Sequence, residues 1–282
     1  MTVERRLKIT KVTPNYWSVL INNPPINLYD PEMFAEINVL LDELERDKDV
    51  QVIVLESANP DFWVAHYDFN RADVMPDMPG AAPYTEWPHM VARFAQQRVL
   101  SVAKLRGRLR GQGSELALAC DIRFASKEKT ILGQPEVGVG VVPGGGGTEW
   151  LATLVGRSRA LEIVCGGDDF DADTAERYGW INRSIPDAEL DAFVDRFARR
   201  VGGFLKRPLE LAKKIVNAQA VYPNEAQLWS GTHAFLGTTV WPESQARLKR
   251  LIELGFMQPG DMEMNMGERI AREADFSDLP RS

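Results

Sequence analysis

The pattern of apolar and polar positions predicts alternating strands and helices at the beginning of the chain. Apolar, β-branched runs at 7–12 and 16–21 predict two neighbouring strands. Between residues 31 and 44, apolar side chains recur at the spacing of one helix face, and Asp30 is placed to cap that helix. The continuous apolar run at 51–55 is typical of a strand that is buried on both faces.

The middle of the chain combines an irregular stretch with further strands. Residues 58–88 show no clear period and are rich in proline, which predicts a long loop of functional or disordered character. We expect a helix at 86–97 and strands at 100–105 and 121–125. Before the last strand, a glycine turn leads into the short apolar helix expected within 111–120. Strands and helices that alternate at this scale indicate an α/β architecture.

Beyond about residue 187 the pattern takes the helical period and keeps it. The candidate helices are 187–204, 209–220, 224–239 and 243–256. We therefore expect an α/β body at residues 1–195 and a helical region at 196–282. The candidate helix at 224–239 has a wide apolar and aromatic face, from which we predict that it contacts other subunits.

Composition narrows the class of protein. The 282 residues are 44% hydrophobic and 26% charged, which suits a globular chain with a sizeable core. A net charge of −7 argues against nucleic acid or an anionic membrane as the main partner. Since the sequence has neither an apolar signal core nor a long uncharged apolar run, we expect a cytoplasmic protein without membrane spans. Cys120 and Cys165 lie in apolar runs and are expected to be small buried hydrophobes in a reducing compartment.

Two glycine-rich stretches, 111–113 and 143–148, are candidates for ligand contacts. Neither has the spacing of a phosphate loop or of the dinucleotide fingerprint. Tight turns are the simplest interpretation. However, the glycines at 111–113 immediately precede a helix, where backbone N–H groups can stabilise developing negative charge. The three histidines, His66, His89 and His233, lack metal-ligand spacing, so no metal site is expected.

Two glutamates are candidates for acid–base chemistry. Glu115 begins an apolar helix, where it can also serve only as a partner of the helix dipole. Glu136 stands between Pro135 and Val137 in a glycine-rich apolar segment, a position that is hard to explain by surface solvation. Two buried carboxyl groups in one pocket can have separated pKa values, one ionised and one protonated.

Taken together, these residues resemble the enoyl-CoA hydratase/isomerase (crotonase) family. The likeness is most specific in Gly111-Gln-Gly-Ser-Glu-Leu-Ala-Leu-Ala-Cys120 and in the glycine-rich segment 132–148. It is also present at 22–28 and 172–182, and it covers most of residues 5–220. The resemblance implies a crotonase-like α/β spiral of ββα units, followed by a helical trimerisation region. It also implies an acyl-CoA substrate and a homotrimer or homohexamer.

The resemblance further implies roles for individual residues. Glu115 matches the base that activates water, and Glu136 matches the acid that protonates the α-carbon. By motif position, the backbone amides of Tyr67 and Gln112 form the oxyanion hole for the thioester oxygen. The segment Tyr67-Asp68-Phe69-Asn70 would line the acyl-CoA. Coenzyme A enters as part of the substrate, so no separate cofactor and no metal are expected.

The sequence departs from the family pattern at two positions of the expected oxyanion hole. His66 and Gln112 stand where the family has glycine. Their side chains either point away from the ligand or enter the pocket and reshape it. Four activities are compatible with these residues. They are a hydratase, an isomerase that uses Glu136 alone, a hydrolase of β-diketones that uses His66, and a non-catalytic acyl-CoA-binding protein.

Overall fold

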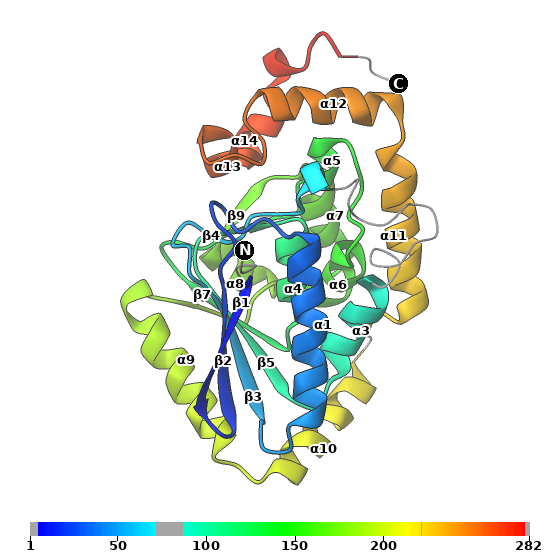
Figure 1. Cartoon of the computed structure of the whole chain (residues 1–282). Coiled ribbons are helices and arrows are strands. Elements are labelled where there is room, and N and C mark those ends of the chain that lie inside the picture. Colours follow the sequence, from blue (N-terminus) through cyan, green and yellow to red (C-terminus); the bar gives the residue numbers. More distant parts are fainter. Residues whose placement is uncertain (1–4, 72–86, 221, 280–282) are drawn as a thin grey trace.

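The structure is a computed structural model that describes residues 5–71, 87–220 and 222–279. Its larger sheet has six strands in the order β1-β2-β3-β5-β7-β10 (Figure 1). Only β1 is antiparallel to its neighbour, and the remaining strand pairs of this sheet are parallel. The strands are β1 (Leu7–Thr13), β2 (Tyr16–Ile21), β3 (Val52–Ser57), β5 (Leu100–Leu105), β7 (Ile122–Ser126) and β10 (Arg183–Ile185).

A second sheet of four short strands has the order β4-β6-β8-β9. Its strands are β4 (Phe62–Val64), β6 (Arg108–Arg110), β8 (Ile131–Gly133) and β9 (Asp169–Asp171). Three times in succession, the chain leaves a strand of the larger sheet and enters a strand of the smaller one: β3 to β4, β5 to β6 and β7 to β8. This repetition confirms the predicted α/β spiral. It also corrects the prediction of an unbroken loop from residue 58, because β4 lies within it.

Helices cover the sheets. The three helices expected in the body, at 31–44, 86–97 and within 111–120, are present, whereas the helices between residues 136 and 178 were not predicted. In the first helix, the Asp30 carboxylate accepts a hydrogen bond of 2.8 Å from the Met33 amide and caps the N-terminus. The predicted face is buried, from Phe34 to Leu44. The helices of the body are α1 (Pro31–Arg46), α3 (Trp87–Gln96), α4 (Gln112–Ala119), α5 (Glu136–Val139), α6 (Gly147–Leu154), α7 (Arg157–Gly166) and α8 (Ala172–Tyr178).

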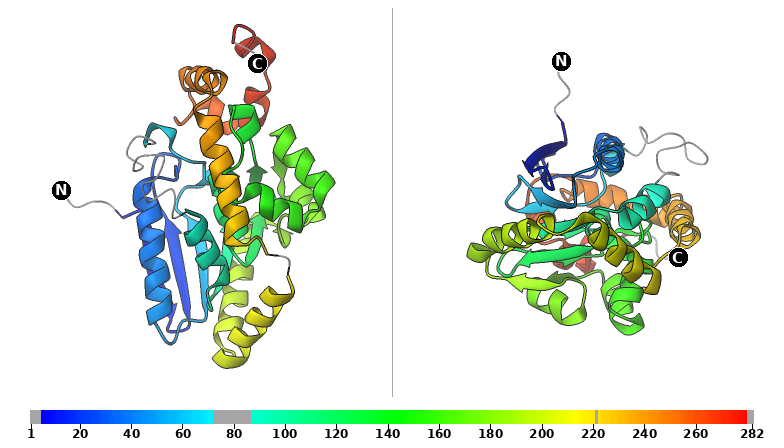
Figure 2. Two further views of the ribbon diagram at one scale, coloured as in Figure 1. Left: turned by 90° about the vertical axis from the view of Figure 1, so that its right-hand side faces the viewer. Right: turned by 90° about the horizontal axis from the view of Figure 1, so that it is seen from below.

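The remaining helices lie against the body and across one end of it. They are α9 (Asp187–Gly202), α10 (Lys206–Gln219), α11 (Glu225–Thr239), α12 (Pro242–Glu253), α13 (Asp261–Met264) and α14 (Met266–Ile270). Helix α9 packs Leu190, Val194 and Ala198 against the larger sheet, so the predicted boundary at residue 195 falls inside it. Helices α12–α14 cap one end of the molecule (Figures 1 and 2). No helix among the described residues is long and apolar enough to cross a membrane.

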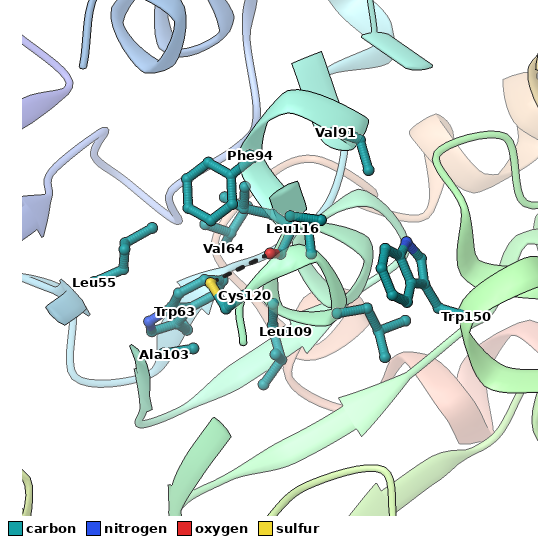
Figure 3. Packing of buried hydrophobic residues seen from close by; sticks show 14 of the residues in the cluster. Leu55, Trp63, Val64, Val91, Phe94, Ala103, Leu109, Leu116, Cys120 and Trp150 are labelled. Carbon is teal, nitrogen blue, oxygen red and sulfur yellow. Dashed lines mark hydrogen bonds between the residues drawn. The ribbon is translucent and has the colours of Figure 1, made fainter. Parts of the chain in front are cut away.

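The core lies between the two sheets and the helices, and Cys120 belongs to it. Trp63, Phe94 and Leu116 pack around this cysteine (Figure 3). The Cys120 thiol donates to the Leu116 carbonyl at 3.6 Å. The prediction that Cys165 is buried is wrong, because this residue lies in the last turn of α7 with its side chain exposed.

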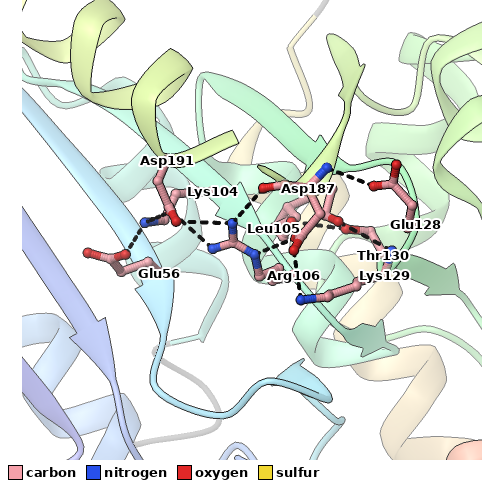
Figure 4. A network of polar contacts seen from close by, with 10 residues as sticks. Glu56, Lys104, Leu105, Arg106, Glu128, Lys129, Thr130, Asp187 and Asp191 are labelled. Carbon is pink, nitrogen blue, oxygen red and sulfur yellow. Dashed lines mark hydrogen bonds and ion pairs between the residues drawn. The ribbon is translucent and has the colours of Figure 1, made fainter. Parts of the chain in front are cut away.

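Charged residues at the end of β5 and just after it join helix α9 to the sheet. Arg106 donates from Nε to Asp187 Oδ1 at 2.6 Å and from a terminal nitrogen to Asp191 at 3.0 Å (Figure 4). Lys104 donates to the same Asp191 at 2.8 Å and also pairs with Glu56. These ion pairs attach α9 to the sheet. Arg106 therefore has structural partners, and they lie outside the glycine-rich segments.

Candidate active site

A small cavity brings together residues from both glycine-rich segments. Its volume is about 40 Å³, which is room for a water molecule and little more. It lies where β4, α4 and α5 meet the helices of the C-terminal part. The lining residues are His66, Tyr67, Phe69, Gly111, Gln112, Glu115, Pro135, Glu136, Val139, Gly144, Phe235, Phe256 and Met266.

Glu115 reaches the cavity from α4 and is held by a glycine loop. Its Oε1 accepts hydrogen bonds from the amides of Gly145 at 2.8 Å and Gly147 at 3.0 Å. Burial raises the pKa of Glu115 to about 7, although the two amides act in the opposite direction. Near neutral pH this carboxyl group can therefore be ionised and accept a proton.

Glu136 reaches the same cavity from the first position of α5. Its Oε1 accepts a hydrogen bond from Gln134 Nε2 at 2.9 Å. Its Oε2 is buried and has no hydrogen-bond partner among the described residues. Burial, and secondly the charge of Glu115, raise the pKa of Glu136 well above the ordinary value. The environment therefore favours the protonated form of Glu136, in which the carboxyl group can donate.

Gly111 lies against Glu136, and its backbone conformation disfavours a side chain. Its φ of +48° lies in the left-handed region, and a Cβ here would stand 3.0 Å from Glu136 Oε1. Gln112 and His66 are different, since neither has a positive φ. Their side chains therefore cause no left-handed strain where the family has glycine. Gln112 is the first residue of α4, where the helix itself does not use the backbone N–H.

The strand-like pairing of Tyr67 with Tyr29 fixes the backbone at the other side of the cavity. The His66 carbonyl accepts a hydrogen bond from the Tyr29 amide at 2.7 Å, and the Asp68 amide donates to the Tyr29 carbonyl at 3.0 Å. In a trans peptide, the Tyr67 N–H points opposite to the His66 carbonyl. The pairing therefore directs this N–H away from Tyr29.

The His66 side chain is buried at the edge of the cavity, with both ring nitrogens in polar contacts. Nδ1 lies 2.8 Å from the Tyr67 carbonyl, and Nε2 lies 2.9 Å from Oε1 of Glu263. The ring stacks on Phe256 at a centroid distance of 4.4 Å. Glu263 was missed by sequence reasoning. The available signal was a carboxylate between Met262 and Met264.

Of the other residues expected to bind the substrate, some line the cavity and others do not. Phe69 lines the cavity, whereas Asp68 and Asn70 lie outside its lining. Burial raises the pKa of Asp68, and its carboxylate accepts from the Asn70 amide at 3.0 Å. Residues 72–86 of the long loop predicted at 58–88 lie outside the described residues. In the described ranges, no three His, Cys, Asp or Glu residues are grouped to hold a metal ion.

Comparisons with known proteins agree with this architecture. Residues 15–248 match the profile of the enoyl-CoA hydratase/isomerase family. A "Probable enoyl-CoA hydratase, mitochondrial" from Dictyostelium discoideum is 31% identical over 71% of this chain and 71% of its own length. A short-chain-enoyl-CoA hydratase from Clostridium acetobutylicum is 30% identical over 71% of this chain and 76% of its own. The crystal structure of a "putative enoyl-CoA hydratase" from Streptomyces avermitilis superposes with a TM-score of 0.89 and is 38% identical, covering 96% of this chain and 99% of that one.

Proposed function

Because the chain belongs to the enoyl-CoA hydratase/isomerase family, and is therefore an enzyme, we propose that it adds water across the double bond of a 2-enoyl-CoA. The observation that carries this proposal is the pair of buried carboxyl groups on one cavity of about 40 Å³. The surroundings of Glu115 allow it to be ionised, and those of Glu136 favour protonation. Addition of water to a double bond requires one base and one acid.

In the proposed reaction, Glu115 is the base. The amides of Gly145 and Gly147 hold its Oε1, so Oε2 is left to accept a hydrogen bond from the attacking water. The water oxygen forms a bond to the β-carbon of the thioester as its proton passes to Glu115. The π-electrons of the double bond move toward the thioester carbonyl, and an enolate-like charge develops on its oxygen.

Glu136 is the acid in the second half of the reaction. Its proton passes to the α-carbon, the enolate returns to a thioester, and the product contains one added water. Glu115 then carries the proton lost by water, and Glu136 has lost its own. Transfer of one proton from Glu115 to Glu136, directly or through solvent, restores the enzyme. The carboxyl groups titrate as a pair, because each charge changes the other's proton affinity.

The backbone amides of Tyr67 and Gln112 are proposed to bind the thioester oxygen. Each residue lines the cavity, and the N–H of Gln112 has the added field of the α4 N-terminus. Fixed amide donors cost no reorganisation when charge develops, which makes them effective in a site shielded from water. Phe69 and Phe235 make one side of the same cavity apolar.

A turnover screen tests this proposal. The purified protein is given 2-enoyl-CoA thioesters of increasing chain length, and mass spectrometry detects a product heavier by one water. A 3-enoyl-CoA thioester tests the isomerase alternative, and a β-diketone tests the hydrolase alternative. The non-catalytic alternative predicts that acyl-CoA raises the melting temperature without any product. Absence of hydration at every chain length would refute the proposed function.

We propose the remaining partners on the same basis. The substrate is an acyl-CoA, and the assembly is a homotrimer or a homohexamer. The protein acts in the cytoplasm and uses neither a metal nor a separate cofactor.

A further inference from the structure

The segment 256–270, hereafter the C-terminal segment, is hydrogen-bonded to the four-stranded sheet beside the cavity. Arg108 donates from Nε to the Met264 carbonyl at 2.7 Å, and Arg110 donates to the Glu263 carbonyl at 2.7 Å. Arg110 is completely buried and also forms two hydrogen bonds with Asp169, at 2.6 and 2.7 Å. Figure 1 shows α13 and α14 of this segment beside the end of the body that carries α5. The C-terminal segment is therefore part of the wall of the site.

At the centre of this contact, the His66 ring lies between two acceptors. The Tyr67 carbonyl, at 2.8 Å from Nδ1, can only accept a hydrogen bond. On the other side, Glu263 Oε1 already accepts from the Met257 amide at 2.7 Å and lies 2.9 Å from Nε2. A neutral imidazole has a single N–H and satisfies one of these contacts, whereas an imidazolium ion satisfies both.

The charge state of Glu263 agrees with this arrangement. Burial alone would raise its pKa, but the charge and hydrogen bond of His66, the Met257 amide and the charge of Arg110 hold the pKa below the ordinary value. Glu263 is fully buried, and its ionised form is favoured only with a cation in direct contact, a place where His66 Nε2 lies.

We propose that Glu263 is a positioning residue of the active site, which holds His66 as an imidazolium ion so that its Nδ1–H fixes the Tyr67 carbonyl. The inference rests on the proposed function, in which the amide of Tyr67 binds the thioester oxygen. The Tyr67 amide and the Tyr67 carbonyl lie in two successive peptide planes that share Cα. The pairing with Tyr29 holds both planes from one side, and the hydrogen bond from His66 holds the second plane from the other, so together they limit rotation of the turn that carries the Tyr67 amide. Stacking on Phe256 keeps the ring in the required plane.

Nitrogen-15 NMR of the histidine rings tests the charge state directly. The chain has three histidines, and the side chain of His89 is 64% exposed, so it serves as an internal reference. At neutral pH, we expect both nitrogens of His66 to carry a proton, and we expect one of these protons to be lost in Glu263→Gln. A wild-type His66 with a single ring proton would overturn the proposal, whatever the activity of the enzyme.

Kinetics and amide exchange test the positioning role. Glu263→Gln should lower kcat for hydration by about 10-fold to 100-fold with little change in KM, the loss expected when a reacting group is misplaced. The backbone amide of Tyr67 should exchange faster with deuterium. Glu263→Asp keeps the charge and should recover part of kcat. Glu268→Gln removes an exposed carboxylate of the same segment and should change neither measurement.

A double-variant cycle completes the test. If Glu263 acts through His66, then His66→Asn combined with Glu263→Gln should cost no more than the larger single loss. Additive losses, or unchanged kcat and amide exchange in Glu263→Gln, would overturn the positioning role. If the wild-type protein hydrates no enoyl-CoA, the proposed function fails. The number of protons on the His66 ring and the exchange rate of the Tyr67 amide then still test whether Glu263 holds His66 and the Tyr67 carbonyl in place.

Discussion

The backbone N–H of Gly145 donates to Oε1 of Glu115 at 2.8 Å, and the Cα of Gly145 faces the other oxygen of the same carboxyl group so closely that a methyl group there would overlap it. The glycine loop thus holds one oxygen and leaves space for the second. This contact explains why a glycine is needed at residue 145 although its φ is not left-handed.

We expect Gly145→Ala to displace the Glu115 carboxyl group and lower kcat by about 10²-fold, since small misplacements of a reacting group have effects of this size. The melting temperature should fall as well, because the buried Trp87, whose Nε1 would lie 2.9 Å from the added methyl group, must also shift. Gly166→Ala is a matched control, as no atom lies within 4 Å of its added methyl group. Steady-state kinetics and thermal unfolding measure both effects. An unchanged kcat in Gly145→Ala would show that this loop does not position the Glu115 carboxyl group.

The acid is tested by Glu136→Gln. Glutamine keeps the shape of the protonated carboxyl group but cannot release its proton, so kcat should fall by about 10²-fold or more. The KM for the thioester should stay nearly constant, since the amides proposed to bind the oxygen are intact. Hydration at the wild-type rate would exclude Glu136 as the proton donor.

The base is tested by Glu115→Gln, which also separates two activities. Hydration needs a group that takes a proton from water and should fall by about 10²-fold. Isomerisation of a 3-enoyl-CoA needs only Glu136 and should persist, if the wild-type enzyme performs it. Parallel assays with both substrates give the answer. Equal loss of both reactions would show that Glu115 has a role besides taking a proton from water.

The rate of hydration should depend on pH in a bell shape. As the pH falls through about 7, Glu115 takes up a proton and can no longer act as base, so the rate falls. At higher pH the rate falls again as Glu136 ionises, because burial and the charge of Glu115 raise its pKa. A profile of kcat against pH checks both limbs. A rate that stays constant from about pH 5 to 9 would contradict the two raised pKa values.

Apolar side chains are exposed along α10 and just before it, with Leu205 79% and Val216 65% exposed. By contrast, α11 buries Phe235 inside its own chain, against Gly144. We predict a trimer or a dimer of trimers. Light scattering at micromolar concentration would refute this prediction if it gave the mass of a single chain.

Long periodic segments made most of the fold predictable. The strands β2 and β5 have the predicted ends, because each is an apolar run of six residues between clear breaks. The strands of the small sheet were not predicted, with three residues each in β4 and β9. A segment of three residues contains too little of any period to distinguish a strand from a loop.

The site was predictable where its residues lie inside one motif. Glu115, Glu136 and Gln112 line a common cavity, as expected from two neighbouring glycine-rich segments. The contact between His66 and Glu263 joins residues 197 positions apart. No local period or spacing contains such a contact, because it depends on where α12 directs the chain. The role of Arg110 was hidden for the same reason, since its partners lie in β9 and in the C-terminal segment.

The place of the C-terminal segment in the sequence sets the order in which the enzyme is completed during translation. Every strand of both sheets is synthesised before Glu263 and Met266, and a chain folds from its N-terminal part onward as it leaves the ribosome. Until then, Arg110 has no carbonyl from residue 263 and His66 has no carboxylate beside it. Arg110 then keeps its pair with Asp169, but the cavity lacks Phe256 and Met266 from its lining, so this side of the body stays hydrated. Glu115 and Glu136 therefore acquire their dry surroundings only after residues 256–270 have been synthesised.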